Sequence, residues 1–205
     1  MPSLSPFDSP QPGNANTDQT DRTEDAGTHA LELSGAVWVD RFPTSTSVED
    51  LSADFRRSVN SFIDAIKNAG GSVTITATYR PPERAYLMHY AWEVARGKVK
   101  PNAVPAMTGV NIQWDHGDEK ASRQAAADMV RGYNIVYRPS LTTNHANQTA
   151  IDMSISGMIG KKIKNKDGEE IEIKTLSDLN AVGASYGIYK NPSDPPHWSA
   201  DVNGR

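Results

Sequence analysis

Two short segments of the chain combine histidine with a carboxylate. In the first, His145 lies in a polar turn of Thr and Asn residues, and Asp152 follows on a stretch that alternates polar and apolar residues. In the second, Asp194 and His197 enclose two prolines, whose restricted backbone holds both side chains in nearly fixed directions. Two imidazoles and one carboxylate, with a fourth position left for water, are the ligands of a catalytic zinc ion. The spacing therefore indicates a Zn²⁺ site formed by His145, Asp152 and His197.

A zinc hydrolase also needs a base that takes a proton from the attacking water and a cation that stabilises the developing oxyanion. Asp194, three residues before His197, can serve as the base. Arg80 ends an alternating stretch on its polar face and can serve as the cation. The sequence thus contains every group that metal-assisted hydrolysis requires.

The same residues also have structural explanations. His145 and Asp152 alone are weak evidence of a metal, because histidine and aspartate often share polar loops. His197 can be a partly buried histidine beside Trp198, Arg80 a surface ion-pair residue, and Asp194 a turn former before proline. Metal content would separate a zinc site from an ordinary polar network.

The other histidines are weaker candidates. His116 lies between Asp115 and Asp118 and is the strongest competing ligand, although a polar turn accounts for it better. His89 lies within an expected helix, where a structural role is favoured. His29 lies at the edge of a polar tail and carries no information on function.

The pattern of apolar residues predicts helices before most of the strands. A helix is expected after Ser47, an alternating strand at 72–80, and a helix from Pro81-Pro82 to Gly97. Then follow a helix at 119–131, strands at 133–137 and 149–156, a β-hairpin at 161–174, a helix at 175–187 and short strands at 188–198. This order predicts an α+β fold, a small single domain with a central antiparallel sheet flanked by helices.

Composition excludes several classes of function. The formal net charge of −4 argues against nucleic acid or an anionic membrane surface as the main partner. The chain has no cysteine, which excludes disulfides, thiolate metal sites and a cysteine nucleophile. No stretch of about 18 apolar residues is present, so no transmembrane segment is expected.

Residues 1–28 differ from the rest of the chain. They contain five acidic residues and one basic residue, few large apolar side chains and many Pro, Ser, Thr, Asn and Gly residues. Such a segment cannot bury enough surface to offset the entropy of ordering it. We therefore expect a disordered acidic leader at 1–28 and one folded domain, which carries the candidate zinc site, at 29–205.

At the candidate site residues the chain resembles a family of zinc D,D-peptidases and L-alanyl-D-glutamate peptidases, which cut the stem peptides of bacterial peptidoglycan. The family motif Ser-x-His-x-x-Gly-x-Ala-x-Asp corresponds here to Thr143, His145, Gln148, Ala150 and Asp152. The downstream motif Glu-x-x-His corresponds to Asp194 and His197, and an earlier Tyr-Arg pair to Tyr79-Arg80. The ordered match covers about residues 72–200.

This resemblance implies a fold of the hedgehog and D,D-peptidase type and a role for each matched residue. His145, Asp152 and His197 would hold zinc, and Asp194 would be the general base. Arg80 would bind the scissile carbonyl oxygen or the substrate, and Thr143 would lie near the substrate. The bond would be that of a D,D-carboxypeptidase, a cross-link endopeptidase or an L-Ala-D-Glu peptidase.

The chain departs from the family motif at three positions. Thr143 replaces Ser, Asp194 replaces Glu and shortens the base by one methylene, and Gln148 replaces Gly. We expect Gln148 to alter the turn or narrow the cleft, and thus to affect substrate preference more than zinc binding. The segment 98–118 and the hairpin at 161–174 are expected to shape the cleft.

The N-terminal residues lack the basic and apolar regions of a secretory signal peptide. We therefore expect synthesis in the cytoplasm and action in the periplasm or cell wall, after release as a phage lysin or delivery as an antibacterial effector of an injection machine. The acidic leader would suit loading into secretion or injection machinery. The alternative function is a non-catalytic zinc-containing binding module of the same fold, which would need neither Asp194 nor Arg80.

Overall fold

The computed structural model describes residues 30–204. The expected leader at 1–28, together with His29 and Arg205, lies outside the described residues. None of the helices in the described part of the chain is both long and apolar enough to cross a membrane.

Within residues 30–204 the chain forms four α-helices, three short 3-10 helices and eight short strands. The α-helices are α1 (Ala53–Asn68), α2 (Pro82–Ala95), α3 (Glu119–Gly132) and α4 (Leu176–Ser185). The strands are β1 (Glu32–Leu33), β2 (Ser72–Ala77), β3 (Ile112–Gln113), β4 (Ala150–Ser156), β5 (Lys162–Lys164), β6 (Glu170–Glu172), β7 (Tyr189–Lys190) and β8 (His197–Ser199). The 3-10 helices are η1 (Ala36–Trp38), η2 (Val48–Asp50) and η3 (Pro101–Ala103).

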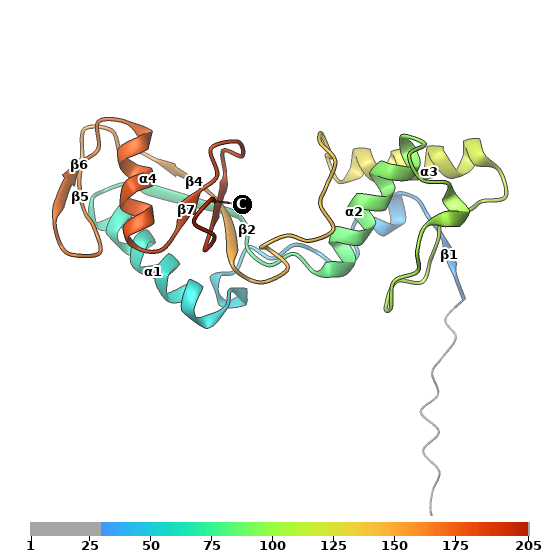
Figure 1. Ribbon diagram of the computed structural model, residues 1–205, viewed down its shortest axis with the longest axis horizontal. Helices are drawn as coiled ribbons and strands as arrows, with labels where there is room; N and C mark the ends of the chain where they lie inside the picture. Colours follow the sequence, from blue (N-terminus) through green and yellow to red (C-terminus); the bar gives the residue numbers. More distant parts are fainter. Residues whose placement is uncertain (1–29, 205) are drawn as a thin grey trace, which may run out of the picture.

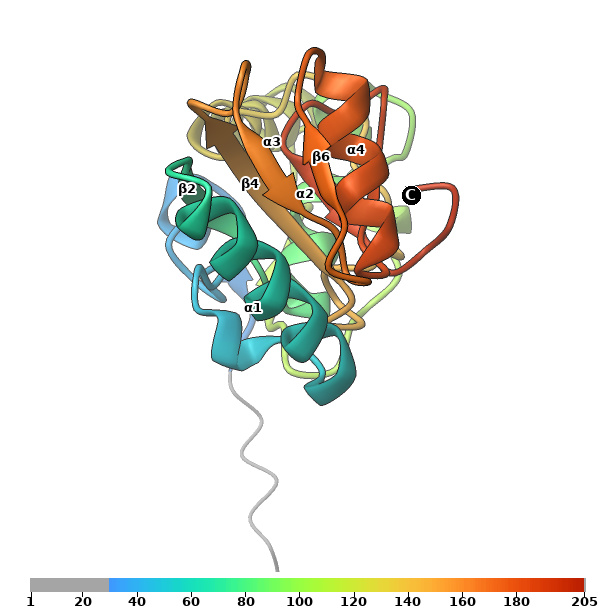
Figure 2. The ribbon, with the colours of Figure 1, turned by 90° about the vertical axis from the view of Figure 1, so that its left-hand side faces the viewer.

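A four-stranded antiparallel sheet in the order β2-β4-β8-β7 forms the centre of one lobe. Helices α1 and α4 lie in front of β4 in Figure 2 and share one core with it. Phe62 of α1, Ile151 of β4 and Val182 of α4 belong to that core. The α+β class and the antiparallel sheet are therefore confirmed.

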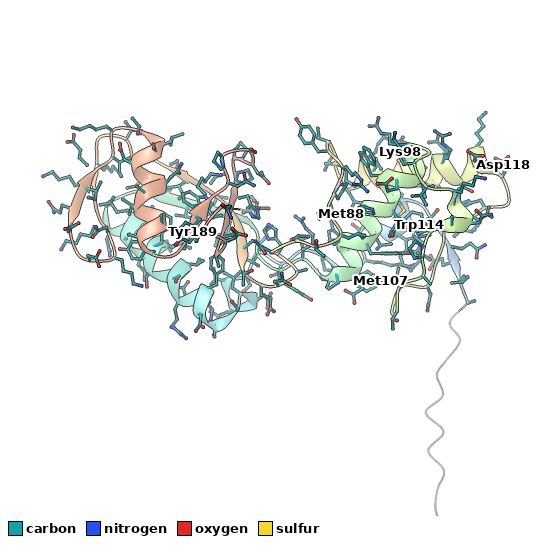
Figure 3. All side chains as sticks on the ribbon, in the orientation of Figure 1. Met88, Lys98, Met107, Trp114, Asp118 and Tyr189 are labelled. Atoms are coloured by element: carbon teal, nitrogen blue, oxygen red, sulfur yellow. The ribbon has the colours of Figure 1, made fainter. Side chains whose placement is uncertain are left out.

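Helices α2 and α3 form a second lobe around a core of their own (Figure 1). Trp38, Leu87, Trp114 and Met129 are buried there, and Figure 3 shows Trp114 in this lobe and Tyr189 in the sheet lobe. The sequence predicted helices flanking a single sheet, whereas α2 and α3 pack on each other. The physical reason lies in α2, which buries side chains on most of its circumference and so needs neighbours on several sides.

The expected strand at 133–137 is absent, because these residues close helix α3. Asn134 adopts a left-handed backbone with φ of 55°. Its N–H donates to the Arg131 carbonyl, and the N–H of Ile135 donates to the Val130 carbonyl. These two bonds satisfy the last carbonyls of the helix in the way that a Schellman motif does. The chain then leaves α3 toward the sheet lobe.

Three segments meet by backbone hydrogen bonds between the two lobes. The N–H of Thr78 donates to the Ser45 carbonyl over 2.7 Å, and the N–H of Ser45 donates to the Tyr79 carbonyl over 2.8 Å. The N–H of Arg80 donates to the His145 carbonyl over 3.3 Å. This junction carries Arg80 and His145, so the candidate site is built where the lobes join.

Candidate metal centre

Three of the predicted residues converge on one point. Nε2 of His145 and Nδ1 of His197 each lie 3.1 Å from Oδ1 of Asp152, and 3.2 Å from each other. A tetrahedral zinc ion with bonds of about 2.0–2.1 Å places its ligand atoms roughly 3.3 Å apart. The donor types and the spacing therefore fit a metal ion bound by all three residues. Among the described residues these three form the one group of this kind.

Sheet pairing and a tight turn bring the three donors together. Asp152 on β4 is the register partner of His197 on β8, and its side chain is on the opposite face from Ile151 and Met153 in the core. His145 lies in the turn before β4, which closes through a hydrogen bond from the N–H of Thr149 to the Asn144 carbonyl. Backbone pairing thus fixes two ligands, and a local turn fixes the third.

The contact made by Nδ1 of His145 determines which ring nitrogen carries the hydrogen. Nδ1 lies 2.7 Å from the carbonyl oxygen of Thr78, which can only accept a hydrogen bond, so Nδ1 holds the hydrogen. When the ring is neutral, its Nε2 presents a lone pair to the carboxylate of Asp152. A register shift between Ile75 and Ala77 turns the end of β2, so that Thr78 is buried rather than on the exposed face. Such an orienting carbonyl is typical of metal-binding histidines.

The carboxylate of Asp152 is ionised at neutral pH. Burial alone would raise its pKa, but the polar contacts of its carboxylate with the imidazoles of His145 and His197 outweigh burial. The pKa of Asp152 therefore lies well below its usual range. An anionic oxygen beside two buried imidazoles is the arrangement that a divalent cation stabilises.

The candidate metal centre opens into a cavity of about 380 Å³. Arg80, Thr143 and Asp194 line it together with the three ligands, so the structure brings all six predicted site residues to one cavity. Pro139, Ser140, Thr142, Asn144 and Asn191 complete the lining. The expectation that 98–118 and 161–174 shape the cleft is wrong, because neither contributes a lining residue and the chain after α3 forms the wall instead.

Arg80 presents a half-buried cation to this cavity. Burial lowers its pKa, and the negative charges of Asp152 and Asp194 oppose that effect. A guanidinium stays protonated under such conditions. Its Nε is buried without a hydrogen-bond partner among the described residues.

Asp194 and Thr143 occupy different positions around the ligands. Asp194 is exposed in the Pro-rich turn, and it lies outside the group of three ligand residues while lining the same cavity. That position suits a base rather than a fourth ligand. The hydroxyl of Thr143 accepts a hydrogen bond from the N–H of His145 over 3.0 Å, which gives it a structural role in the turn.

Gln148 adopts a left-handed backbone in the turn before β4. Its φ is 60°, in the left-handed region that glycine adopts without strain. Its N–H donates to the His145 carbonyl, and its carbonyl accepts from the N–H of Ser52. Gln148 is not among the residues that line the cavity, and its effect on the turn stays a prediction.

The competing histidines have other partners. Nε2 of His116 lies 3.0 Å from the hydroxyl of Ser34, and Nδ1 of His89 lies 2.7 Å from the Pro139 carbonyl. Sequence reasoning missed Lys190, whose ammonium donates to three carbonyls of the turn that carries Asp194 and His197. No motif marks this lysine, because its role depends on backbone atoms.

Comparison with known proteins does not identify a family for this chain. No protein-family model matches the chain, and a search of curated proteins finds no match. In this chain His145, Asp152 and His197 converge beside the half-buried Arg80 and the exposed carboxylate of Asp194.

Proposed function

We propose that the protein is a zinc-dependent peptidase that hydrolyses peptide bonds of peptidoglycan stem peptides. The observation that carries the proposal is the convergence of three ligand atoms within 3.2 Å of one another, in a cavity that also holds Arg80 and Asp194. The choice of substrate class is supported by the motif that links Thr143 to Asp152 and Asp194 to His197.

In this proposal zinc, when bound by the three ligands, supplies a Lewis acid that makes its water more acidic. Asp194 takes the proton of the attacking water and later gives it to the leaving amine. Arg80 holds the oxygen of the scissile carbonyl and stabilises its negative charge as the tetrahedral intermediate forms. One water is consumed, and a carboxylic acid and an amine are released.

Delivery of the enzyme to the cell wall is part of the same proposal. We propose that it acts in the periplasm or cell wall as a released lysin or an injected antibacterial effector, and that residues 1–28 mediate loading. Removing these residues would abolish delivery while leaving hydrolysis by the purified protein intact. Unchanged export or killing by the truncated chain would refute the role of the leader.

The proposal is tested by digesting isolated peptidoglycan with the zinc-loaded chain, the chelated chain and the chelated chain with zinc restored. Mass spectrometry of the products names the bond: loss of a terminal D-Ala, opening of a cross-link, or cleavage between L-Ala and D-Glu. We expect cleavage that disappears with chelator and returns with zinc. A chain that binds zinc but cleaves none of these bonds would favour the non-catalytic binding module.

A further inference from the structure

The turn between β7 and β8 carries both Asp194 and His197, and it closes into a ring of hydrogen bonds. The N–H of Asp194 donates to the Asn191 carbonyl, and the N–H of His197 donates to the Asp194 carbonyl. The N–H of Asn191 donates back to the His197 carbonyl over 3.0 Å. Three carbonyls spaced three residues apart are thereby linked in a closed cycle.

The ammonium of Lys190 binds all three of these carbonyls. Nζ lies 2.7 Å from the oxygen of Asn191, 2.6 Å from that of Asp194 and 3.1 Å from that of His197. An ammonium has three hydrogens, so these contacts satisfy its donors completely. Among the described residues Lys190 forms no ion pair with a carboxylate, which shows that backbone oxygens are its partners.

We propose that Lys190 is a positioning residue that holds the turn at 191–197 in the conformation that sets Asp194 against the metal ligand His197. The inference depends on the proposed function for its effect on catalysis, but the contacts stand without it. Three carbonyl dipoles that point toward one another repel, and a cation between them converts this repulsion into attraction. The ring therefore requires a positive charge at its centre.

The surroundings of Lys190 agree with this role. Burial lowers its pKa, and the charges of Asp194 and Asp152 oppose that change. Its Nζ also lies 5.5 Å from the centre of the Trp198 ring, a cation–π distance. Lys190 connects the base and one ligand through their main chains and touches neither of their side chains in the described contacts.

A neighbouring cavity makes the proposal testable by chemical rescue. Lys190 and Asn191 line a groove of about 480 Å³ together with Pro192, Pro195 and Trp198. Truncating Lys190 to alanine would leave the three carbonyls facing a space that a small amine can enter from this groove. Methylammonium or ethylammonium can then replace the lost ammonium. Such rescue would not occur if the side chain of Lys190 only filled space.

The experiment compares Lys190→Met, Lys190→Ala and the control Lys162→Met, an exposed lysine whose side chain is 67% accessible. Amide hydrogen exchange at Asn191, Asp194 and His197 is measured in each chain, along with zinc affinity and peptidoglycan hydrolysis. For the Lys190 variants we expect faster exchange at these three amides and a kcat lower by about 10–100-fold at saturating zinc. Protection in β2 and β4 should stay, which shows that the variants are folded.

Adding ethylammonium to Lys190→Ala should restore both protection and kcat in a saturable way, with no effect on Lys162→Met. Unchanged exchange at the three amides would overturn the proposal, as would faster exchange with wild-type kcat. If the wild-type chain cleaves nothing, the peptidase proposal fails, and exchange with and without ethylammonium still decides the role of Lys190.

Discussion

Nε2 of His145 and Oδ1 of Asp152 lie 3.1 Å apart, although each presents a lone pair to the other. The arrangement follows from Thr78, whose carbonyl engages the opposite nitrogen of the imidazole ring. Two acceptors this close repel unless a cation lies between them. Nδ1 of His197 approaches the same point, so a divalent metal bound there would remove the repulsion among all three atoms.

Replacing Asp194 separates metal binding from catalysis. Asp194 lines the cavity without belonging to the ligand group, so Asp194→Asn should keep zinc and lose the acid–base step. We expect kcat to fall by about 10²–10⁴-fold. Zinc content and hydrolysis are measured on the same preparation, with Asp167→Asn in the exposed hairpin turn as control. Near wild-type turnover of Asp194→Asn would remove it from the role of base.

Replacing Gln148 by glycine should affect the stability of the fold in the opposite direction from the same replacement within a helix. Gln148 has a left-handed backbone. This conformation destabilises the folded chain by about 1–2 kcal/mol in residues other than glycine. Gln148→Gly should therefore match or exceed wild-type stability. Gln124→Gly, an identical change within α3, should cost about 1 kcal/mol. Urea unfolding measures both, and equal losses in the two variants would show that the turn at 148 carries no such strain.

The cleft wall at 139–144 is attached to the second lobe through α2. The carboxylate of buried Glu93 accepts a hydrogen bond from Arg138, and the adjacent Pro139 carbonyl accepts one from His89. Glu93→Gln weakens this attachment, and we expect KM to rise about tenfold with kcat and zinc affinity retained. The exposed Glu119→Gln serves as control. A loss of kcat at constant KM would contradict this role of the wall.

Stability at high pH reports on the second core. Burial raises the pKa of Tyr133 to about 12, opposed by Arg84 and aided by Asp40, whereas the unfolded chain titrates near 10. Between these values the unfolded state loses the proton first, so the free energy of unfolding falls as pH rises from about 10 to about 12. Tyr133→Phe should reduce the slope of the free energy of unfolding against pH. The control Tyr137→Phe, at an exposed tyrosine, should leave that slope unchanged. Equal slopes in all three chains would contradict the burial of this hydroxyl.

The three candidate ligands could be predicted from the sequence because each lies in a short segment with a recognisable pattern. Asp152 and His197 lie on adjacent strands in register, and His145 is carried by the turn that leads into one of them. Alternation along β4 was enough to put Asp152 on the face opposite Ile151. The prediction of an α+β fold likewise followed from the order of helices and strands.

Other features depend on contacts that no local pattern encodes. The role of Lys190 arises from three carbonyls that converge only when the turn has closed. The wall at 139–144 owes its place to Glu93 and His89, which lie far from it in sequence. The second core could not be inferred either, because apolar residues around α2 identify a buried helix but not its neighbours.

The central claim is that His145, Asp152 and His197 hold one zinc ion, and calorimetric titration of the metal-free chain with zinc tests it most directly. The account predicts one site per chain, lost or weakened at least about 100-fold in His145→Ala and His197→Ala, and unchanged in His116→Ala. Zinc binding of equal strength in the wild-type chain and both ligand variants, or no binding by the wild-type chain, would contradict it.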